Sequence, residues 1–312
     1  MKHQGSEDLR LLVGFSEGSG SNVVARMISP TLSEVLNQTV TVERVEGENG
    51  ARCVERLAHA APDGRTLAIA AQTQIIGTLL HKRRYDPLVD FVPVAVFAKW
   101  PMVFAVSNTL GITSVSEFIT LAQSQPRQLT YASSAIGGAP HLAGVLFSVM
   151  AGIDMQLRVY SETNTLYVDL VQGRIAATFN NIVSALPLAR AGKVRMLAVT
   201  GRARNPMAPE VPTLDEAALA GYEVVNWLGI VAPAATPAAI ITRINAAMAR
   251  TVETRNVRDT LLAHGMEPVV AAPEAFATHI RAEIERWGKF INANRAAFAE
   301  EKLFNIRRRR QQ

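Results

Sequence analysis

Two loops rich in glycine and serine are the segments of this sequence whose residue types suit ligand chemistry. The first loop follows an apolar run and carries three glycines together with Ser19, Ser21 and Asn22. Glycine lets the backbone approach a ligand closely, and Ser and Asn are good N-cap residues. Free N–H groups at a helix N-terminus, with the positive end of the helix dipole, bind anions. The loop therefore indicates a seat for an anion, although a cap and turn without a ligand would use the same residues.

A second loop of the same design follows an apolar run that ends at Ser133. Ser133 and Ser134 offer hydroxyl groups. We expect Gly137 and Gly138 to expose backbone N–H groups before a helix that begins at His141. Two such seats, one in each domain, could hold both ends of a dicarboxylate. Four further side chains at predicted strand ends could add neutral hydrogen bonds: Gln72, Thr73, Asn180 and Asn181.

An enzyme is the competing interpretation of the first loop. Gly14–Gly18 reads G-x-S-x-G, which in hydrolases places a nucleophilic serine between a strand and a helix. In that fold an earlier loop supplies half of the oxyanion hole, yet only 15 residues precede Ser16. Asp169 followed by His264 or His279 has the right order for a triad, but nothing ties these residues to the serine. The six histidines show no metal-ligand spacing, so we expect no metal site. We also expect no catalytic residue and no other cofactor.

The charge balance argues against a nucleic-acid partner. Lys and Arg number 32 against 27 Asp and Glu, a net charge of +5, and Arg307–Arg310 supply four of these charges. Aromatic residues, which stack on bases, make up only 6% of the chain. We interpret the Arg run as a solvated terminus.

The composition gives only partial information about the cellular compartment of the protein. Cys53 is the sole cysteine, so neither an intrachain disulfide nor a multi-cysteine zinc site can form. No apolar run reaches the roughly 18 residues that a membrane span needs. Met1–Asp8 lack the apolar core of a secretory signal peptide, which leaves both a cytoplasmic protein and a processed, exported protein open.

Short apolar runs alternate with helical patterns, which is typical of a parallel sheet with helices on its faces. Strands are predicted at Leu9–Phe15, Thr39–Val45, Thr66–Ala71, Phe104–Ser107, Leu129–Ser133, Gln156–Tyr160, Ala176–Phe179, Val194–Val199 and Val224–Val231. Helices are predicted at Val23–Leu36, Ala51–Ala61, Val115–Ser124, His141–Met150 and after Pro237, where one short strand near Pro268–Val270 intervenes. Pro30 should kink or interrupt the first helix. The rhythm restarts in mid-chain, so we expect two α/β domains, at 1–104 plus 227–312 and at 105–226. The ligand should lie in a cleft between them, at the carboxyl ends of the strands.

The sequence also resembles the Bug/TctC family, the extracytoplasmic solute receptors of tripartite tricarboxylate transporters. The similarity runs from about Leu9 to Asn294 and rests on the order and spacing of short segments. These segments are Phe15–Asn22, Ala61–Leu67, Tyr85–Pro87, Asp90–Pro93, Leu129–Ser133, His141–Gly144, Ser184–Pro187, Ala191–Lys193, Leu197–Thr200, Val211–Thr213, Gly221–Glu223 and Ala232–Pro233.

The resemblance implies a two-lobed periplasmic-binding-protein fold, type II-like, with crossing hinge strands and Venus-flytrap closure. It implies a ligand held by backbone N–H groups, hydroxyl groups and ordered water, a two-subunit membrane transporter as partner, and the periplasm as location. We accordingly expect a monomeric, non-enzymatic receptor for a mono-, di- or tricarboxylate or an amino acid. A ligand-sensing module of a signalling system and an enzyme on the same fold stay open as alternatives.

Three positions depart from the family pattern. The first loop usually reads Pro-Pro-Gly-Gly with an Asp near the helix start, where this chain has Ser16–Gly20 and Asn22. Lys-Gly usually follows the second-lobe tyrosine, where Ser161–Glu162 stand here. The first residue of the second-lobe Asn pair is usually Asp, which is Asn180 in this chain.

These departures place Glu17 and Glu162 near the predicted cleft. A glutamate that faces inward would repel a second carboxylate on the ligand. We therefore predict a preference for a monocarboxylate, one that could also carry an amino or amide group, over citrate. Two solvent-facing glutamates are the alternative.

Overall fold

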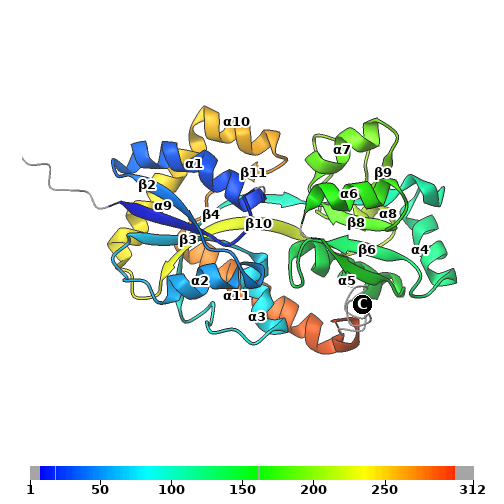
Figure 1. Cartoon of the computed structure of the whole chain (residues 1–312), viewed down its shortest axis with the longest axis horizontal. Coiled ribbons are helices and arrows are strands. Elements are labelled where there is room, and N and C mark those ends of the chain that lie inside the picture. Colours follow the sequence, from blue (N-terminus) through cyan, green and yellow to red (C-terminus); the bar gives the residue numbers. More distant parts are fainter. Residues whose placement is uncertain (1–7, 18, 161, 299–312) are drawn as a thin grey trace, which may run out of the picture. The chain divides into compact units, whose positions relative to one another are not determined.

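The computed structural model describes residues 8–17, 19–160 and 162–298, which form two compact α/β units (Figure 1). Unit 1 comprises the described residues up to Lys99 together with Trp227–Gly288. Unit 2 comprises Trp100–Asn226 together with the described residues from Lys289 on. The chain passes between the units in three elements, which are β4 (Phe91–Pro101), β10 (Val225–Pro233) and α11 (Pro273–Ala293).

Unit 1 is built on a six-stranded sheet of order β11-β4-β10-β3-β1-β2. Its other strands are β1 (Leu9–Val13), β2 (Val40–Arg44), β3 (Thr66–Ala71) and β11 (Glu267–Pro268). The strands β1, β2 and β3 are parallel, and β10 runs antiparallel to β3. Every residue of β3 is buried, as expected for a parallel strand covered by helices on both faces.

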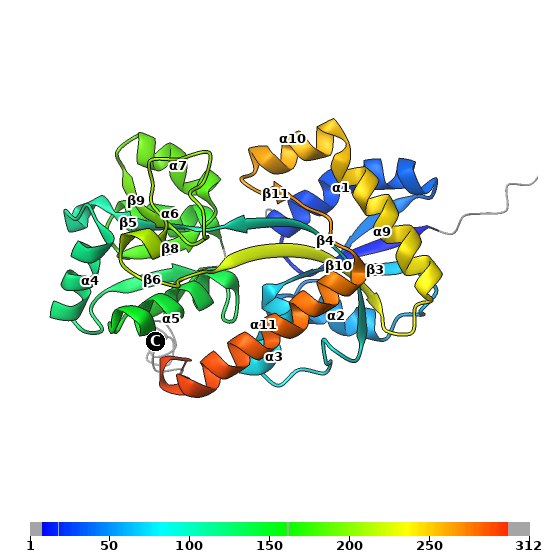
Figure 2. The same ribbon diagram turned by 180° about the vertical axis from the view of Figure 1, so that it is seen from behind.

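The helices of unit 1 cover both faces of this sheet. Besides α11 they are α1 (Gly20–Leu36), α2 (Ala51–Ala58), α3 (Gln72–Leu80), α9 (Ala238–Glu253) and α10 (Arg255–Ala263), with a 3-10 turn, η1 (Glu48–Gly50), before α2. Helix α1 packs on α9 and α10, whereas α2 and α3 pack on β1 and β3 from the other side (Figure 2). The carboxyl end of β3 leads directly into the first turn of α3, whereas a short loop connects the carboxyl end of β1 to α1.

Unit 2 contains a five-stranded sheet of order β7-β6-β8-β5-β9. Its strands are β5 (Val103–Ser107), β6 (Thr130–Ser133), β7 (Gln156–Val159), β8 (Ala177–Asn180) and β9 (Val194–Val199). Its helices are α4 (Val115–Ser124), α5 (Ala139–Ala151), α6 (Thr163–Val171), α7 (Ile182–Arg190) and α8 (Leu214–Ala217), with the 3-10 turns η2 (Asn108–Leu110) and η3 (Arg295–Phe298). The strands β6, β7 and β8 are parallel, and β5 runs antiparallel to both β8 and β9.

The core of unit 2 follows the two-residue alternation of its central strand β5. Val103 and Ala105 join the apolar cluster beneath α6 and α7. Phe104 points to the opposite face, where its ring centroid lies 4.8 Å from that of Phe179 and 4.7 Å from that of Phe147. Alternate residues thus fill two separate cores, as a strand covered on both faces requires.

Several elements differ from the sequence-based expectations. Helix α1 continues through Pro30, so the expected interruption is wrong. Proline has no backbone N–H to donate to the Arg26 carbonyl, and this carbonyl instead accepts a hydrogen bond from the Ser29 hydroxyl at 3.3 Å. The strand β4 and the helix α3 were not predicted, and β4 contains Pro93 and Pro101, which weaken a strand pattern.

The described C-terminal residues, 289–298, group with unit 2, whereas the sequence placed them in the first domain. The reason lies in η3, which packs on α5, where the Phe298 ring lies 5.5 Å from the His141 ring. The first crossing falls after Lys99, earlier than the expected boundary at 104/105.

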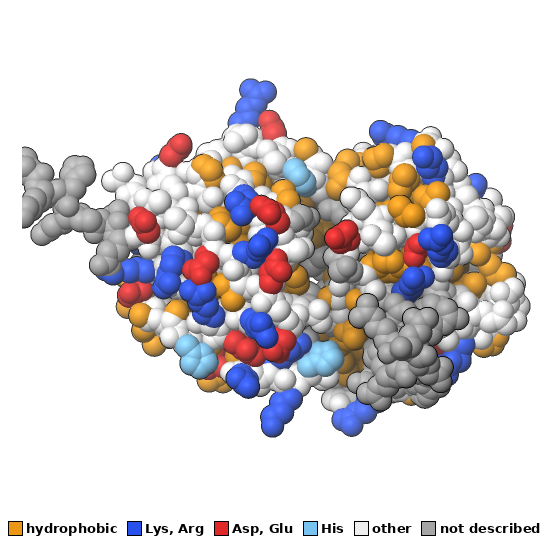
Figure 3. Space-filling view, viewed as in Figure 1, with side chains coloured by type: hydrophobic (Ala, Val, Ile, Leu, Met, Phe, Trp, Pro, Cys, Tyr) orange, Lys and Arg blue, Asp and Glu red, His pale blue; other side chains and the backbone are white. Residues whose placement is uncertain are grey.

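The described residues contain no helix that is both long and apolar enough to cross a membrane. On the face shown in Figure 3, acidic and basic side chains are intermixed over unit 1. Unit 1 contains ion pairs such as Arg44 with Glu46 at 3.3 Å and Arg83 with Glu48 at 3.0 Å.

Candidate ligand-binding site

Ser19, Ser21 and Asn22 lie at the start of α1, after the loop that follows β1. Ser19 is the N-cap residue, and its hydroxyl oxygen accepts a hydrogen bond from the Asn22 backbone N–H at 3.3 Å. The hydroxyl oxygens of Ser19 and Ser21 lie 3.3 Å apart. The first turn of α1 carries no acidic residue, so the positive end of its dipole is not compensated there.

The side chain of Asn22 is fully buried in the first turn of this helix. The Arg26 Nε donates to its Oδ1 at 3.0 Å, one helical turn further on. The Nδ2 atom of Asn22 is buried and has no hydrogen-bond partner among the residues that the structure describes. A buried amide without a partner is costly, so this group is a candidate donor to a ligand.

Gln72 and Thr73 open α3 at the carboxyl end of β3. Thr73 is half-buried, whereas Gln72 is 1% exposed. The Gln72 Nε2 donates to Glu283 Oε2 at 2.6 Å, and within the described parts of the chain its Oε1 has no hydrogen-bond partner. Gln72 is therefore a candidate acceptor at the same sheet edge as Asn22.

Helix α11 supplies the residues that hold Gln72, and these residues were not predicted from the sequence. Glu283 is buried and also accepts a hydrogen bond from Trp287 Nε1 at 3.3 Å. One turn before it, the His279 ring lies 5.6 Å from the Trp227 ring. Burial lowers the pKa of His279 and nearby Lys99 lowers it further, while Glu283 opposes this shift. The spacing of four residues placed His279, Glu283 and Trp287 on one helical face, but it gave no sign of what this face contacts.

In unit 2, several polar groups of the loop after β6 form hydrogen bonds within the loop or to the first turn of α5. Ser133 is buried, and its hydroxyl donates to the Ala135 carbonyl at 2.9 Å. The Gly137 N–H donates to His141 Nδ1 at 3.0 Å, and the Gly138 N–H donates to the Ala135 carbonyl at 3.4 Å. The prediction that both glycines expose free N–H groups is therefore wrong, because the sharp turn at Gly137 (φ +79°) folds these groups back into the loop. Ser134 is exposed.

Asn180 is the last residue of β8, Asn181 follows it as the N-cap residue of α7, and both are half-buried. Asn180 Oδ1 accepts from the Asn181 N–H at 2.8 Å, and Asn181 caps α7 by accepting from the Val183 N–H at 3.1 Å. Glu162 occupies the N-cap position of α6, where it is exposed and makes no side-chain capping bond. The structure thus brings three predicted loops to the carboxyl ends of three neighbouring parallel strands, β7, β6 and β8.

The buried carboxylate of Asp169 lies near this edge, and its structural role was not predicted from the sequence. Asp169 Oδ2 accepts from the Tyr160 hydroxyl at 2.6 Å and lies 3.3 Å from Arg158, while its Oδ1 accepts from Arg174 at 3.0 Å. Both oxygens are engaged, so Asp169 anchors α6 to the end of β7. The described residues contain no group of three or more His, Cys, Asp or Glu that could hold a metal ion.

Glu17 is 71% exposed at its side chain. Its carboxylate oxygens lie 3.6 Å from Arg26 and 3.8 Å from Arg44. Exposed ion pairs of this kind are weak, but they offset part of the negative charge on the first loop.

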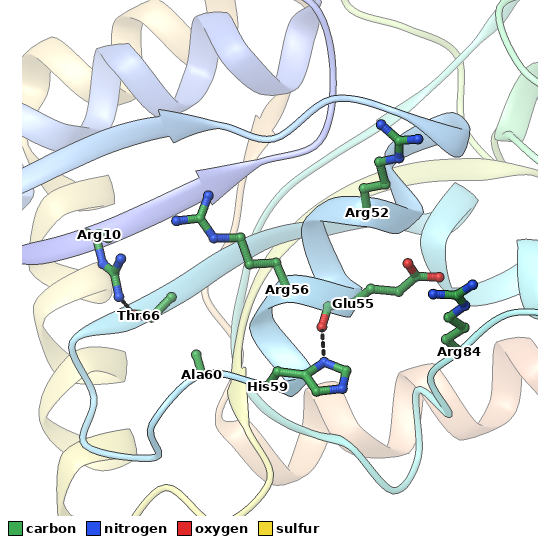
Figure 4. Close-up of a pocket in the computed structure, with 8 residues that line it drawn as sticks. All are labelled: Arg10, Arg52, Glu55, Arg56, His59, Ala60, Thr66 and Arg84. Atoms are coloured by element: carbon green, nitrogen blue, oxygen red, sulfur yellow. Dashed lines mark hydrogen bonds between the residues drawn. The ribbon is translucent and has the colours of Figure 1, made fainter.

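A surface pocket of about 520 Å³ lies beside α2 in unit 1 (Figure 4). It is lined by Arg10, Arg52, Glu55, Arg56, His59, Ala60, Thr66 and Arg84. Arg10 donates to the Thr66 hydroxyl at 2.9 Å, and Arg56 pairs with Glu43. Part of the positive charge is therefore compensated within the chain, and none of the predicted ligand residues lines this pocket.

Two α/β units, each with polar loops at the carboxyl ends of its parallel strands, define a periplasmic binding protein. The chain belongs to the tripartite tricarboxylate transporter family receptors (TctC), whose family pattern matches residues 24–295. This confirms the family that the sequence motifs predicted.

Relatives and solved structures agree with this membership. A UPF0065 protein in the tcbD-tcbE intergenic region of Pseudomonas sp. is 32% identical over 288 residues, which cover 92% of this chain and 86% of the relative. Protein BugT of Bordetella pertussis is 28% identical, with 91% of this chain and 88% of the relative covered. The R. palustris Rpa4515 structure with adipate matches with a TM-score of 0.83 at 33% identity, covering 91% of this chain and 96% of that one. MatC from Rhodopseudomonas palustris with bound malate matches with a TM-score of 0.81 at 30% identity, covering 90% and 98%.

Proposed function

We propose that this protein captures a small carboxylate and delivers it to the membrane subunits of a tripartite tricarboxylate-type transporter. The observation that carries the proposal is the family match over residues 24–295. Two similar structures contain adipate and malate, both of which are small carboxylates. A periplasmic location is proposed on the same family membership.

In this mechanism the ligand binds in a cleft between the polar loops of the two units. Unit 1 contributes the first turns of α1 and α3, with Ser21 and Asn22 as donors. Unit 2 contributes the loops after its parallel strands, with Ser134 and Asn180 as polar groups. A ligand that contacts both units favours a closed arrangement by its higher affinity for that state.

The charge of the loops favours a monocarboxylate over citrate in this proposal. Glu17 and Glu162 are exposed, and either carboxylate would repel a second carboxylate of a ligand bound beside it. Arg26 and Arg44 offset part of the Glu17 charge, whereas no ion pair to Glu162 is found among the described residues. Calorimetric titration with citrate, amino acids and aromatic acids tests this preference, and tight binding of citrate alone would contradict it.

Native mass spectrometry of the purified protein, followed by a thermal-shift screen of small carboxylates, tests the function. A receptor should retain a co-purified acid or show a melting temperature that rises with ligand concentration. Ligand at 100 times its Kd stabilises the folded state by about 2.7 kcal/mol. No bound species and no shift across dicarboxylates, amino acids and aromatic acids would refute carboxylate capture.

A further inference from the structure

Two buried amide groups in unit 1 each present one atom without a hydrogen-bond partner among the described residues. These atoms are Asn22 Nδ2, which is a donor, and Gln72 Oε1, which is an acceptor. Both side chains are at most 1% exposed. Buried polar atoms in native proteins nearly always have partners, so these two atoms point to a bound molecule.

The orientation of the Asn22 amide is fixed by its neighbour. A guanidinium group can only donate hydrogen bonds. Because Arg26 Nε lies 3.0 Å from Asn22 Oδ1, the amide oxygen must face Arg26. The NH₂ group is therefore left as the unpartnered end.

The orientation of the Gln72 amide is fixed in the opposite sense. Trp287 Nε1, which can only donate, donates to Glu283 Oε2, so this oxygen acts as an acceptor. The Gln72 NH₂ group donates to the same oxygen at 2.6 Å. The carbonyl oxygen of Gln72 is therefore left as the unpartnered end.

The two amides belong to one edge of one sheet. The strands β1 and β3, which lead to them, are direct parallel neighbours. The loop after β1 also packs closely against η1. A Cβ added at Gly14 in this loop would lie only 2.7 Å from the Gly50 Cα. A Cβ added at Gly50 would in turn lie 3.0 Å from the side-chain nitrogen of Gln74, in the first turn of α3.

We infer that the ligand carries an O–H or N–H donor beside its carboxylate, and that Gln72 Oε1 accepts a hydrogen bond from this donor. Asn22 Nδ2 donates to a carboxylate oxygen of the same molecule. The inference rests on the proposed function and narrows its ligand class to hydroxy acids and amino acids, in preference to unsubstituted acids. Glu283 is a positioning residue, because it holds Gln72 with its acceptor free.

Isothermal titration of the full chain with matched pairs of acids tests this inference. The pairs are malate and succinate, lactate and propionate, glutamate and glutarate, and phenyllactate and phenylpropionate, which differ by one hydroxyl or amino group. The donor-bearing member of the pair that binds should bind about tenfold more tightly, the value of one hydrogen bond. Equal or tighter binding of the unsubstituted acid would overturn the inference and leave carboxylate capture standing. Binding of none of these acids would overturn both.

The variant Glu283→Gln tests the positioning role. A glutamine can donate as well as accept, so the Gln72 amide is free to turn. The preference for the donor-bearing acid should fall to about threefold or less, while the affinity for the unsubstituted acid stays within about threefold of wild type. Glu285→Gln makes the same chemical change at an exposed position of α11 and should keep the wild-type preference.

A melting curve shows whether each variant is folded. Should Glu283→Gln fail to fold, Gln72→Met removes the acceptor at nearly constant volume and should abolish the preference in the same way. If the folded variant, Glu283→Gln or in its place Gln72→Met, still prefers the donor-bearing acid as strongly as wild type does, the proposed role of Gln72 is overturned.

Discussion

Asn in place of Asp169 should destabilise the protein because this carboxylate is the centre of a buried polar cluster. The Asp169 side chain is 7% exposed and accepts the Tyr160 hydroxyl at 2.6 Å. A hydrogen bond to a charged acceptor contributes about 1.5–3 kcal/mol. Arg174 is 61% exposed, so its ion pair adds at most about 1 kcal/mol. An asparagine keeps one acceptor oxygen, so we expect Asp169→Asn to lower the free energy of unfolding by about 2–3 kcal/mol.

Urea denaturation followed by circular dichroism measures this change. The matched control is Arg174→Gln, which removes only the exposed ion pair and should cost less than about 1 kcal/mol. A loss below about 0.5 kcal/mol for Asp169→Asn would refute the reasoning, since the buried bond to Tyr160 would then contribute nothing.

The same cluster predicts the pH dependence of stability. Burial raises the pKa of Asp169, but hydrogen bonds from Tyr160 and Arg174 and the charge of Arg158 lower it by more, so the net pKa lies below its ordinary value. A depressed pKa in the folded state gives stabilisation that is present at neutral pH. It declines once the pH falls below the unfolded value of about 4. The stability difference between wild type and Asp169→Asn should therefore narrow in acid.

Three further predictions concern separate positions. A Cβ at Gly144 would lie 2.0 Å from the buried Tyr131 ring, so Gly144→Ala should lower the free energy of unfolding by about 1–3 kcal/mol. An unchanged urea midpoint would contradict this close packing. Burial raises the pKa of the Cys53 thiol to about 12, so a thiol reagent at pH 8 should modify it only after denaturation. Glu17→Gln should change stability by less than about 0.5 kcal/mol and should tighten citrate binding. Unchanged citrate affinity would show that this charge does not select the ligand.

The alternating pattern of apolar runs and helical segments was sufficient to predict the α/β class. Strands such as Thr66–Ala71 were predicted correctly because a parallel strand covered on both faces is a continuous apolar run. The strand β4 was missed because its prolines weaken the local pattern, and its pairing with neighbours far along the chain outweighs them. Local signals therefore identified most elements, while long-range pairing decided the exceptions.

The candidate site divides in the same way. The sequence by itself determined which loops follow the parallel strands, and the types of the residues in them determined that Ser19 and Asn181 cap helices. Only the tertiary structure decided which amide atoms have no partner among the described residues. Gln72 and its partner Glu283 are 211 positions apart, and the direction of an amide depends on the neighbour that donates or accepts. That neighbour is set by how α11 packs against α3, and no local pattern in the chain encodes this contact.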